Sequence, residues 1–230
     1  MPAERFFYNN LLKDNQTITL TGEEATHLLK VMRTQPGDVV EIINGKSQLA
    51  HARLKNASKT SAELFIEKLV EQPHPKEGLI LCIAMPKFNR LEWIIEKGTE
   101  LGVIAFWLFD GDLSEKTSLS EQQHLRLNHL AISALKQCGR LDLPSIELKK
   151  PLAQWEVPQG TLLFGDTLID AQPIAASYPL PIYFFSGPEK GFGKKELDLL
   201  NKWKAKGVSL NRNILRADTA PIAAAAILGR

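Results

Sequence analysis

The stretch "SGPEKGFGKKE", Ser186–Glu196, places glycines, a proline and charged residues where a predicted strand ends and a predicted helix begins. Before it, "YPLPIYFF" is apolar, β-branched and aromatic, which is typical of a buried strand. After it, "KKELDLLNKWKAKG" has the spacing of a helix. Such a junction is either a plain connector or a backbone cradle for a ligand.

The glycines of this stretch match neither of two common phosphate loops. Five residues separate Gly187 from Gly193, and Lys195 stands where a Walker A loop needs a hydroxyl. The G-x-G-x-x-G pattern is also missing. Glycines at the carboxyl end of a strand still let a ligand approach the backbone, at the edge where open α/β sheets bind ligands. The alternative is a turn that needs glycine for its backbone angles.

A second stretch, "LNRNILRADTAP" (residues 210–221), also follows a predicted strand and precedes a predicted helix. Asp218 or Thr219 can cap that helix, with Pro221 in its first turn, and a cap is the plain structural interpretation of Asp218. Arg216 precedes the cap and can bind phosphate or hold a neighbouring loop. Two such loops at one sheet edge indicate a ligand site more strongly than one.

From residue 78 onward, predicted strands alternate with predicted helices, which indicates a parallel sheet with helices on both faces. The expected strands lie at 78–85, 104–109, 145–148, 161–165, 181–185 and 207–210. The expected helices lie at 88–102, 118–139, 194–207 and 216–228. Ser118 and Glu121 predict a capping box, and Gly102 and Gly139 predict helix ends.

The chain before residue 70 consists of short β-branched runs separated by turns. The expected strands lie at 16–20, 38–43, 51–56 and 61–69. The Asn-Gly of "NGKS" (44–47) predicts a hairpin, and "TGEEATHLLKVMR" (21–33) predicts a helix with a Thr21/Glu24 capping box. About six strands in this length predict a small closed or half-closed barrel. The segment Val70–Gly78, rich in proline and charge, is the expected linker.

The composition predicts a globular protein without a membrane segment. Of the 230 residues, 44% are hydrophobic and 23% are charged, which favours a sizeable core over disorder. The apolar runs are too short for a bilayer and the N-terminus lacks the apolar stretch of a signal peptide, so a cytoplasmic location is expected. Cys82 and Cys138 are expected to be reduced, and the scattered His and Cys residues predict no metal site.

Charge is unevenly distributed along the chain, although the net charge is only +2. Residues 190–216 carry eight Lys/Arg and two acidic residues, whereas residues 1–72 carry nine of each. A locally basic stretch suits a polyanion such as nucleic acid, although a basic helix face is often only solvated.

Together the two loops resemble the paired signature loops of the SPOUT methyltransferases, and more narrowly of the RsmE family of 16S ribosomal RNA uridine-N3 methyltransferases. Other stretches resemble that family in the same order. "RFF" and "HLLKVMRTQPGD" resemble its PUA-like domain, and "KFNRLEWIIEKGTELGV" and "QCGRLDLP" resemble two of its central motifs. The resemblance implies an α/β fold. A PUA-like RNA-binding β-barrel would span 1–72, and a SPOUT domain with a parallel sheet and a C-terminal trefoil knot would span 73–230.

The resemblance also implies a cofactor, S-adenosylmethionine, and partners: 16S ribosomal RNA or the assembled small ribosomal subunit, and a second copy in a homodimer. Glycines and Asn211 would bring the backbone close to the cofactor, while Leu210, Ile214 and Leu215 would enclose the adenine. The implied cofactor-binding residues are Leu163, Phe164, Gly165, Ser186, Gly187, Glu189, Gly191, Leu210, Asn211, Ile214, Leu215 and Arg216.

Three positions depart from the usual pattern of the family. Lys190 replaces a glycine and adds bulk and charge beside the expected cofactor. Asn211 also replaces a glycine, and Asn tolerates a positive φ. Asp218 replaces a Glu, which keeps the charge but shortens the reach.

Uridine N3 is a weak nucleophile while it is protonated, and base pairing hides it, so the base must be exposed and its proton removed or offset. Glu189 and Asp218 are candidate proton acceptors, and Arg140 and Arg216 are candidates for stabilising a uracil anion. Glu189 is equally well interpreted as a carboxylate that holds its loop. The expected RNA contacts are Arg5, His27, Lys30, Arg33, Lys87 and Arg90.

Two other functions remain open from the sequence. The same fold can methylate another RNA nucleotide, for example at a ribose 2′-oxygen. A non-catalytic RNA-binding protein with a decayed cofactor site is the second, and Lys190 and Asn211 are the residues that would favour it. A nucleotide hydrolase is disfavoured because no Ser or Thr follows Lys194.

Overall fold

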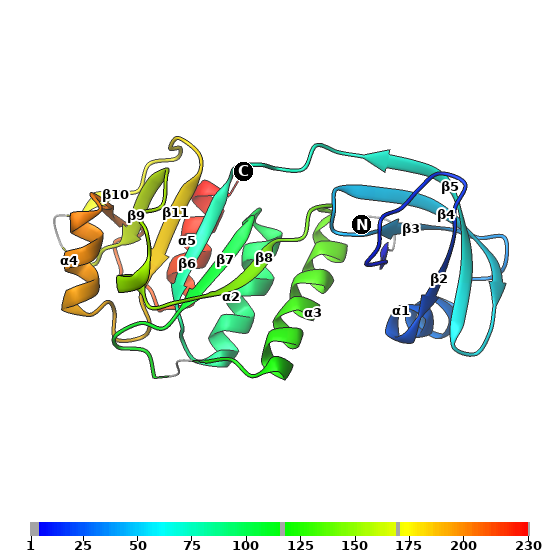
Figure 1. The fold of residues 1–230 in the computed structure, drawn as a ribbon, viewed down its shortest axis with the longest axis horizontal. Coiled ribbons are helices and arrows are strands. Elements are labelled where there is room, and N and C mark those ends of the chain that lie inside the picture. The colour runs from blue at the N-terminus through cyan, green and yellow to red at the C-terminus, as the bar shows by residue number, and fades with distance from the viewer. Residues whose placement is uncertain (1–4, 116–117, 169–170, 230) are drawn as a thin grey trace. The chain divides into compact units, whose positions relative to one another are not determined.

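The computed structural model describes residues 5–115, 118–168 and 171–229 (Figure 1). These residues form two compact units. The first contains the described residues up to His74 together with Ile132–Leu143, and the second contains Pro75–Ala131 and the described residues from Pro144 onward. No local pattern in the sequence predicted that a later segment would join the N-terminal unit. The expected boundary at residues 72 and 73 stays a prediction.

The first unit is built on a curled five-stranded sheet with the order β1-β3-β4-β5-β2. Its strands are β1 (Arg5–Phe7), β2 (Thr17–Thr21), β3 (Val39–Ile43), β4 (Gln48–Ala57) and β5 (Ser61–Glu71). The pairing of β1 with β3 is parallel and the others are antiparallel. The register between β4 and β5 shifts twice, which bends a sheet. No ladder joins β1 to β2 in the described residues, so the expected barrel is half-closed.

The helix expected over 21–33 is instead two short segments, α1 (Gly22–Thr26) and the π-helix η1 (His27–Val31). Thr21 occupies the N-cap position, but its side chain makes no capping hydrogen bond, so the predicted capping box is wrong. Glu24 instead accepts a hydrogen bond from the backbone N–H of Phe7 at 3.0 Å and pairs with Lys136 Nζ at 2.7 Å. This carboxylate fastens α1 to β1 and to residues 132–143.

The predicted hairpin joins β3 to β4, and residues 132–143 are hydrogen-bonded to it. Positive φ angles occur at Gly45 (70°) and Ser47 (63°), and not at Asn44 as the Asn-Gly pattern suggested. Ser47 N–H donates to the carbonyl of Leu141 at 2.8 Å, and Leu143 N–H donates to that of Gly45 at 2.9 Å. These bonds join the "QCGRLDL" part of the stretch (residues 137–143) to the first unit.

The second unit contains a seven-stranded parallel sheet with the order β10-β12-β9-β11-β6-β7-β8, as the alternating pattern predicted. The strands are β6 (Leu79–Ala84), β7 (Ala105–Phe109), β8 (Ser145–Lys149), β9 (Thr161–Gly165), β10 (Gln172–Pro173), β11 (Ile182–Ser186) and β12 (Lys206–Ser209). Only the two-residue β10 was not expected. The central β6 is buried along its whole length, as a strand covered on both faces must be.

Helices cover both faces of this sheet. On one face, α2 (Phe88–Glu100) contacts α5 (Thr219–Leu228), which in turn contacts β6 and β11. Gly98 of α2 packs so closely that an added Cβ would lie 2.6 Å from the ring of Phe106. On the opposite face, to which Trp107 points because strand residues alternate, Leu200 of α4 (Lys194–Lys202) joins the buried cluster.

Two helix ends differ from expectation. The helix α3 begins at Glu121 and ends at Cys138, and its capping box is Ser120 with Gln123, two residues later than predicted. Gln123 N–H donates to Ser120 Oγ at 3.2 Å, and Ser120 N–H donates to Gln123 Oε1 at 3.1 Å. The helix α4 ends at Lys202, because Lys204 adopts a positive φ of 59°.

The path of the chain after β12 determines what meets at the sheet edge. Strand β12 lies beyond β9, between β9 and β10, whereas α5 contacts β11 and β6. Residues 210–218 therefore carry the chain back from β12 towards the centre of the sheet. This segment is one of the two loops that the sequence singled out.

Candidate functional site

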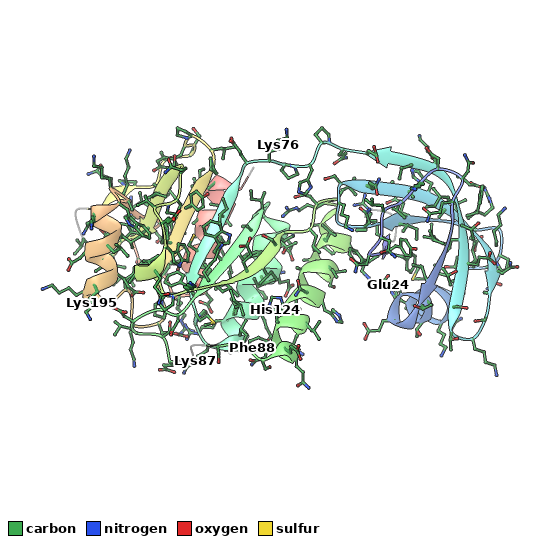
Figure 2. The ribbon with its side chains drawn as sticks, viewed as in Figure 1. Glu24, Lys76, Lys87, Phe88, His124 and Lys195 are labelled. Carbon is green, nitrogen blue, oxygen red and sulfur yellow. The ribbon has the colours of Figure 1, made fainter. Side chains whose placement is uncertain are left out.

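The predicted loops lie at one edge of the parallel sheet, the edge at which open α/β sheets bind ligands. Neighbouring strands β12, β9, β11 and β6 end at Ser209, Gly165, Ser186 and Ala84. The segments that follow them are thus brought together, although the chain separates them by up to 125 residues (from Ala84 to Ser209). In Figure 2, Lys87 and Phe88 after β6 lie at the same end of the sheet as Lys195 at the start of α4.

Two glycines of the loop after β11 are required for different reasons. An added Cβ at Gly187 would lie 2.9 Å from backbone atoms of Gly191 and Phe192, so the loop closes tightly on itself there. Gly191 has a φ of 77°, and its N–H donates to the carbonyl of Pro188 at 2.9 Å to close a turn. No described heavy atom lies within 4 Å of a Cβ built on Gly191, so a ligand can approach this backbone.

The two departures from glycine are compatible with the observed loops. Lys190 lies within the Pro188–Gly191 turn without a positive φ, and its side chain is 64% exposed. Asn211 also lacks a positive φ, so the expectation that it replaces glycine through left-handed geometry is wrong. Its Oδ1 accepts from Asn213 N–H at 3.0 Å, and its carbonyl accepts from Ser209 Oγ at 3.1 Å. Asn211 therefore holds the start of its own loop.

Glu189 is held by the beginning of α2. Its Oε1 accepts the backbone N–H of Lys87 at 3.2 Å and lies 3.3 Å from Arg90 Nε. Both charged side chains are largely covered, at 21% exposure for Glu189 and 25% for Arg90. The geometry supports the interpretation of Glu189 as a loop-holding carboxylate. It also places Arg90, an expected RNA contact, against an expected cofactor loop.

The loop after β12 presents its side chains to solvent. Ile214 is 81% exposed, Arg216 is exposed and Leu215 is half-buried. Asp218 is the N-cap of α5, where its Oδ1 accepts from Thr219 N–H at 2.9 Å, and Pro221 lies in the first turn. The capping interpretation of Asp218 is confirmed. The second carboxylate oxygen accepts no hydrogen bond from a described residue.

The side chains that precede the loop after β9 belong to the core. Leu163 is fully buried, and Phe164 packs edge-on against Phe192 at a ring distance of 6.4 Å. Gly165 is the last residue of the strand and pairs with Val208. Leu163 and Phe164 thus support the sheet edge, and Gly165 is the residue of this segment that reaches it.

Glu196 is a structural residue of this edge that the sequence analysis missed. It is 5% exposed, and its two oxygens accept from Gly193 N–H at 2.8 Å and Asp112 N–H at 3.3 Å. Burial raises the pKa of this carboxyl, the two backbone hydrogen bonds oppose that rise, and nearby Asp112 and Asp110 add to it. The Gly193-to-Glu196 spacing, half of a capping box, was the signal that could have identified it.

The remaining predicted residues belong to the first unit, and so does Arg140, which pairs with Asp142. Arg5 Nε lies 2.8 Å from Glu41 Oε2, and His27 packs against the ring of Phe6. Lys30 and Arg33 are exposed. His27 and Lys30 lie in the π-helix η1 and not in the α-helix expected over 21–33. A hollow of about 440 Å³ is lined by Phe6, Met32, Arg33, Thr34, Asp38, Val39, Val40, Glu41 and His51.

Within residues 5–115, 118–168 and 171–229, no three His, Cys, Asp or Glu side chains are grouped so that they could hold a metal ion. Within the same ranges, no helix is both long enough and apolar enough to cross a membrane.

Comparison with known proteins relates both units to RNA methyltransferases. Residues 72–229 match the RNA methyltransferase domain family, and residues 20–67 match the RNA methyltransferase PUA domain family. The ribosomal RNA small subunit methyltransferase E of Synechocystis sp. is 31% identical over 221 residues, which are 91% of this chain and 72% of that protein. Its namesake from Rickettsia conorii is 28% identical over 234 residues, 98% of this chain and 95% of the relative.

A solved structure shares the fold over nearly the whole chain. It is the ribosomal RNA small subunit methyltransferase E from Neisseria gonorrhoeae bound to S-adenosyl methionine. The TM-score is 0.83 at 26% sequence identity, and the match covers 97% of this chain and 95% of the other.

Proposed function

This chain belongs to the RNA methyltransferase family of ribosomal RNA small subunit methyltransferase E, and on that premise we propose that it methylates N3 of a uridine in 16S ribosomal RNA with S-adenosylmethionine. The names of the relatives support small-subunit ribosomal RNA as the substrate. The ligand bound in the Neisseria gonorrhoeae structure supports S-adenosylmethionine as the cofactor. The choice of N3 and of uridine rests on the sequence resemblance. The observation that carries the proposal is the meeting of the loops after β9, β11 and β12 at one sheet edge.

The residues at this edge fit a bound S-adenosylmethionine. Gly191 offers its backbone at close range because no described heavy atom fills the place of its missing side chain. The exposed Ile214 and the half-buried Leu210 and Leu215 offer apolar surface for an adenine. When bound, the cofactor supplies a methyl group activated by a positive sulfur.

Side chains of the two loops are suited to three further roles: positioning the backbone, stabilising negative charge and accepting a proton. Glu189 holds the loop after β11 in place through Lys87 N–H and Arg90, so it positions the backbone around Gly191. Arg216 is exposed beside the helix cap and is suited to stabilise negative charge on the uracil ring. One carboxylate oxygen of Asp218 makes the capping bond, and the other oxygen can accept the N3 proton.

We further propose that the chain is knotted at its C-terminus. In support, residues 210–218 return from the outer strand β12 to the centre of the sheet, past the ends of β9 and β11. A trefoil knot would be formed if this return passes through the loop between β9 and β11. It would fix the two cofactor loops against each other.

We propose that residues 1–72 bind RNA and that residues 73–230 carry catalysis. The match of residues 20–67 to a PUA domain supports the first assignment. Arg5, His27, Lys30 and Arg33 are its candidate contacts, and Lys87 and Arg90 are the candidates from residues 73–230. We also propose that the protein acts as a homodimer in the cytoplasm, on 16S RNA or on the small subunit, as its resemblance to the family implies.

The proposal is tested by incubating the purified protein with small subunits from a strain that lacks it, in the presence of labelled S-adenosylmethionine. Mass spectrometry of nucleosides from the labelled RNA should then show N3-methyluridine. A labelled 2′-O-methyl nucleoside would instead support the other RNA methyltransferase assignment. If calorimetry detects no heat on titration with S-adenosylmethionine, the protein is an RNA-binding protein with a decayed cofactor site.

A further inference from the structure

Glu115, in the loop after β7, lies between two lysines at the same sheet edge. Its Oε2 is 3.7 Å from Lys87 Nζ, and its Oε1 is 4.0 Å from Lys190 Nζ. Lys87 precedes α2, and Lys190 belongs to the turn after β11. Each carboxylate oxygen thus faces one ammonium group, and the three side chains come from three different loops of the second unit.

The two lysines border the loops proposed to hold the cofactor. The backbone N–H of Lys87 donates to Glu189, the residue next to Lys190 in the chain. Arg90 pairs with Glu189 from the same side. Lys87, Lys190 and Arg90 thus bring three cations to Glu115 and Glu189, beside the proposed methyl-transfer site.

Another anion can replace Glu115 in its two ion pairs. The side chains of Lys87, Lys190 and Glu115 are 59%, 64% and 52% exposed. Ion pairs that are this exposed and this long contribute little to stability, because water and salt screen them. A phosphodiester presents two oxygens that share one negative charge, in a similar arrangement to a carboxylate. RNA brings many such groups and gains affinity from the counterions it releases.

We propose that Lys87 and Lys190 together bind a phosphate of the substrate RNA, and that Glu115 occupies this phosphate position in the free protein. The proposal rests on the RNA methyltransferase function proposed above. It gives a role to Lys190, which stands where the family usually has glycine. The lysine turns outward from its loop and adds an RNA contact without altering the backbone that a cofactor would need.

The test measures binding of a 16S RNA fragment to the full-length protein by fluorescence anisotropy at several salt concentrations. Lys190→Gly, which restores the usual residue of the family, should weaken binding about 3- to 10-fold and lower the slope of log affinity against log salt by about one. Lys87→Ala should act similarly. Lys195→Ala is the matched control, because Lys195 is also exposed at this end of the unit and has no ion pair in the described structure. It should change affinity less than 2-fold.

Glu115→Gln should change RNA affinity in the opposite direction to the lysine substitutions, and it is therefore the more discriminating variant. Removing the competing carboxylate should tighten RNA binding about 2- to 5-fold in the otherwise unchanged protein. In a protein that already carries Lys87→Ala and Lys190→Gly, the same substitution should have no effect, since its targets are gone. If Glu115→Gln weakens binding, or if Lys190→Gly behaves like Lys195→Ala, the proposal is wrong.

Two further measurements distinguish a failure of this proposal from a failure of the proposed function. Calorimetry with S-adenosylmethionine should give the same Kd for Lys190→Gly as for the unsubstituted protein. If cofactor affinity falls while RNA affinity does not, the lysines bind the cofactor carboxylate and the proposal fails. Methyl transfer by the unsubstituted protein tests the function alone: a protein that transfers methyl groups but shows none of the substitution effects refutes only the phosphate site.

Discussion

The two loops at the sheet edge are held in place to very different degrees. The loop after β11 is bonded to its neighbours through Glu189, which binds Lys87 and Arg90, and through Glu196, which binds Gly193 and Asp112. The loop after β12 is held by bonds within itself and by the cap of α5. The loop after β11 is thus held in place without a ligand and is called the built loop below. The loop after β12 keeps apolar and cationic side chains exposed. For the proposed function, we therefore expect the first loop mainly to position the ligand and the second loop to contact it.

The largest effect on activity is expected in the exposed loop, at Arg216. Arg216→Ala should lower kcat for methyl transfer by about 100-fold or more, because it removes the group that we propose stabilises charge in the transition state. Arg212→Ala, which removes an exposed arginine from the same loop, is the control and should retain activity. The measurement is the rate of label transfer to RNA, with circular dichroism as a check of folding. Full activity of Arg216→Ala would remove this residue from the site.

The largest effect on stability is expected in the built loop, at Glu196. Glu196→Ala leaves the N–H of the buried Gly193 and the N–H of Asp112 without their acceptor, which should lower the free energy of unfolding by about 1–3 kcal/mol. Asp198→Ala, an exposed position on the same helix, should change it by less than about 0.5 kcal/mol. Urea denaturation measures both. Equal stability of the two variants would show that the built loop does not depend on this carboxylate.

The Glu196 carboxyl also gives the built loop a pH dependence with a defined sign. Its pKa is raised in the folded protein, so the folded state binds its proton more tightly than the unfolded state does. Relative to Glu196→Gln, the unsubstituted protein should therefore lose stability as pH rises from the unfolded value of about 4.5 through the folded pKa. Denaturation midpoints at a series of pH values measure the difference. A difference that grows in favour of Glu196 with rising pH contradicts the account.

The two candidate proton acceptors provide a direct comparison of the loops. Asp218→Asn keeps an oxygen for the helix cap but cannot accept a proton, so kcat should fall about 10- to 100-fold. Glu189→Gln can still accept the N–H of Lys87 but loses the charge that pairs with Arg90, so it should mainly raise the KM for S-adenosylmethionine, by a few fold. Steady-state kinetics separate the two patterns. The reverse assignment would make Glu189 the proton acceptor.

The smallest expected effect belongs to the most exposed apolar side chain of the site. Because Ile214 is 81% exposed, Ile214→Ala should leave the free energy of unfolding within about 0.5 kcal/mol. Loss of its contact with adenine should raise the Kd for S-adenosylmethionine by about 3- to 10-fold, the equivalent of one or two buried methylenes. Calorimetry gives both the Kd and the heat. An unchanged Kd would mean that the adenine lies elsewhere.

The parallel sheet and its loops were predictable because their signals are local. Strands such as "GLILCIAM" are continuous apolar runs, and a helix follows each of β6, β7, β11 and β12, so this alternation indicates a parallel sheet. The Asp218 cap and the hairpin at Gly45 follow from short-range rules of the same kind. The pairing of the two loops at one edge then follows from the sheet.

What failed depended on contacts between distant residues. Glu24 has the correct spacing for a capping box with Thr21, but Phe7 N–H and Lys136 bind its carboxylate instead. Residues 132–143 joined the first unit through bonds to the hairpin at Gly45, which no local pattern records. Glu189 was correctly given a second interpretation as a loop-holding carboxylate, yet its partners Lys87 and Arg90 lie about 100 residues earlier and were assigned to RNA.

Hydrogen exchange with and without saturating S-adenosylmethionine tests the central claim most directly, since that claim is that both loops together bind this cofactor. The amides of residues 210–218 should exchange quickly in the free protein and gain strong protection with the ligand, while those of residues 187–193 start protected and gain less. Protection that appears at neither loop, or that develops in another part of the chain, would contradict the account.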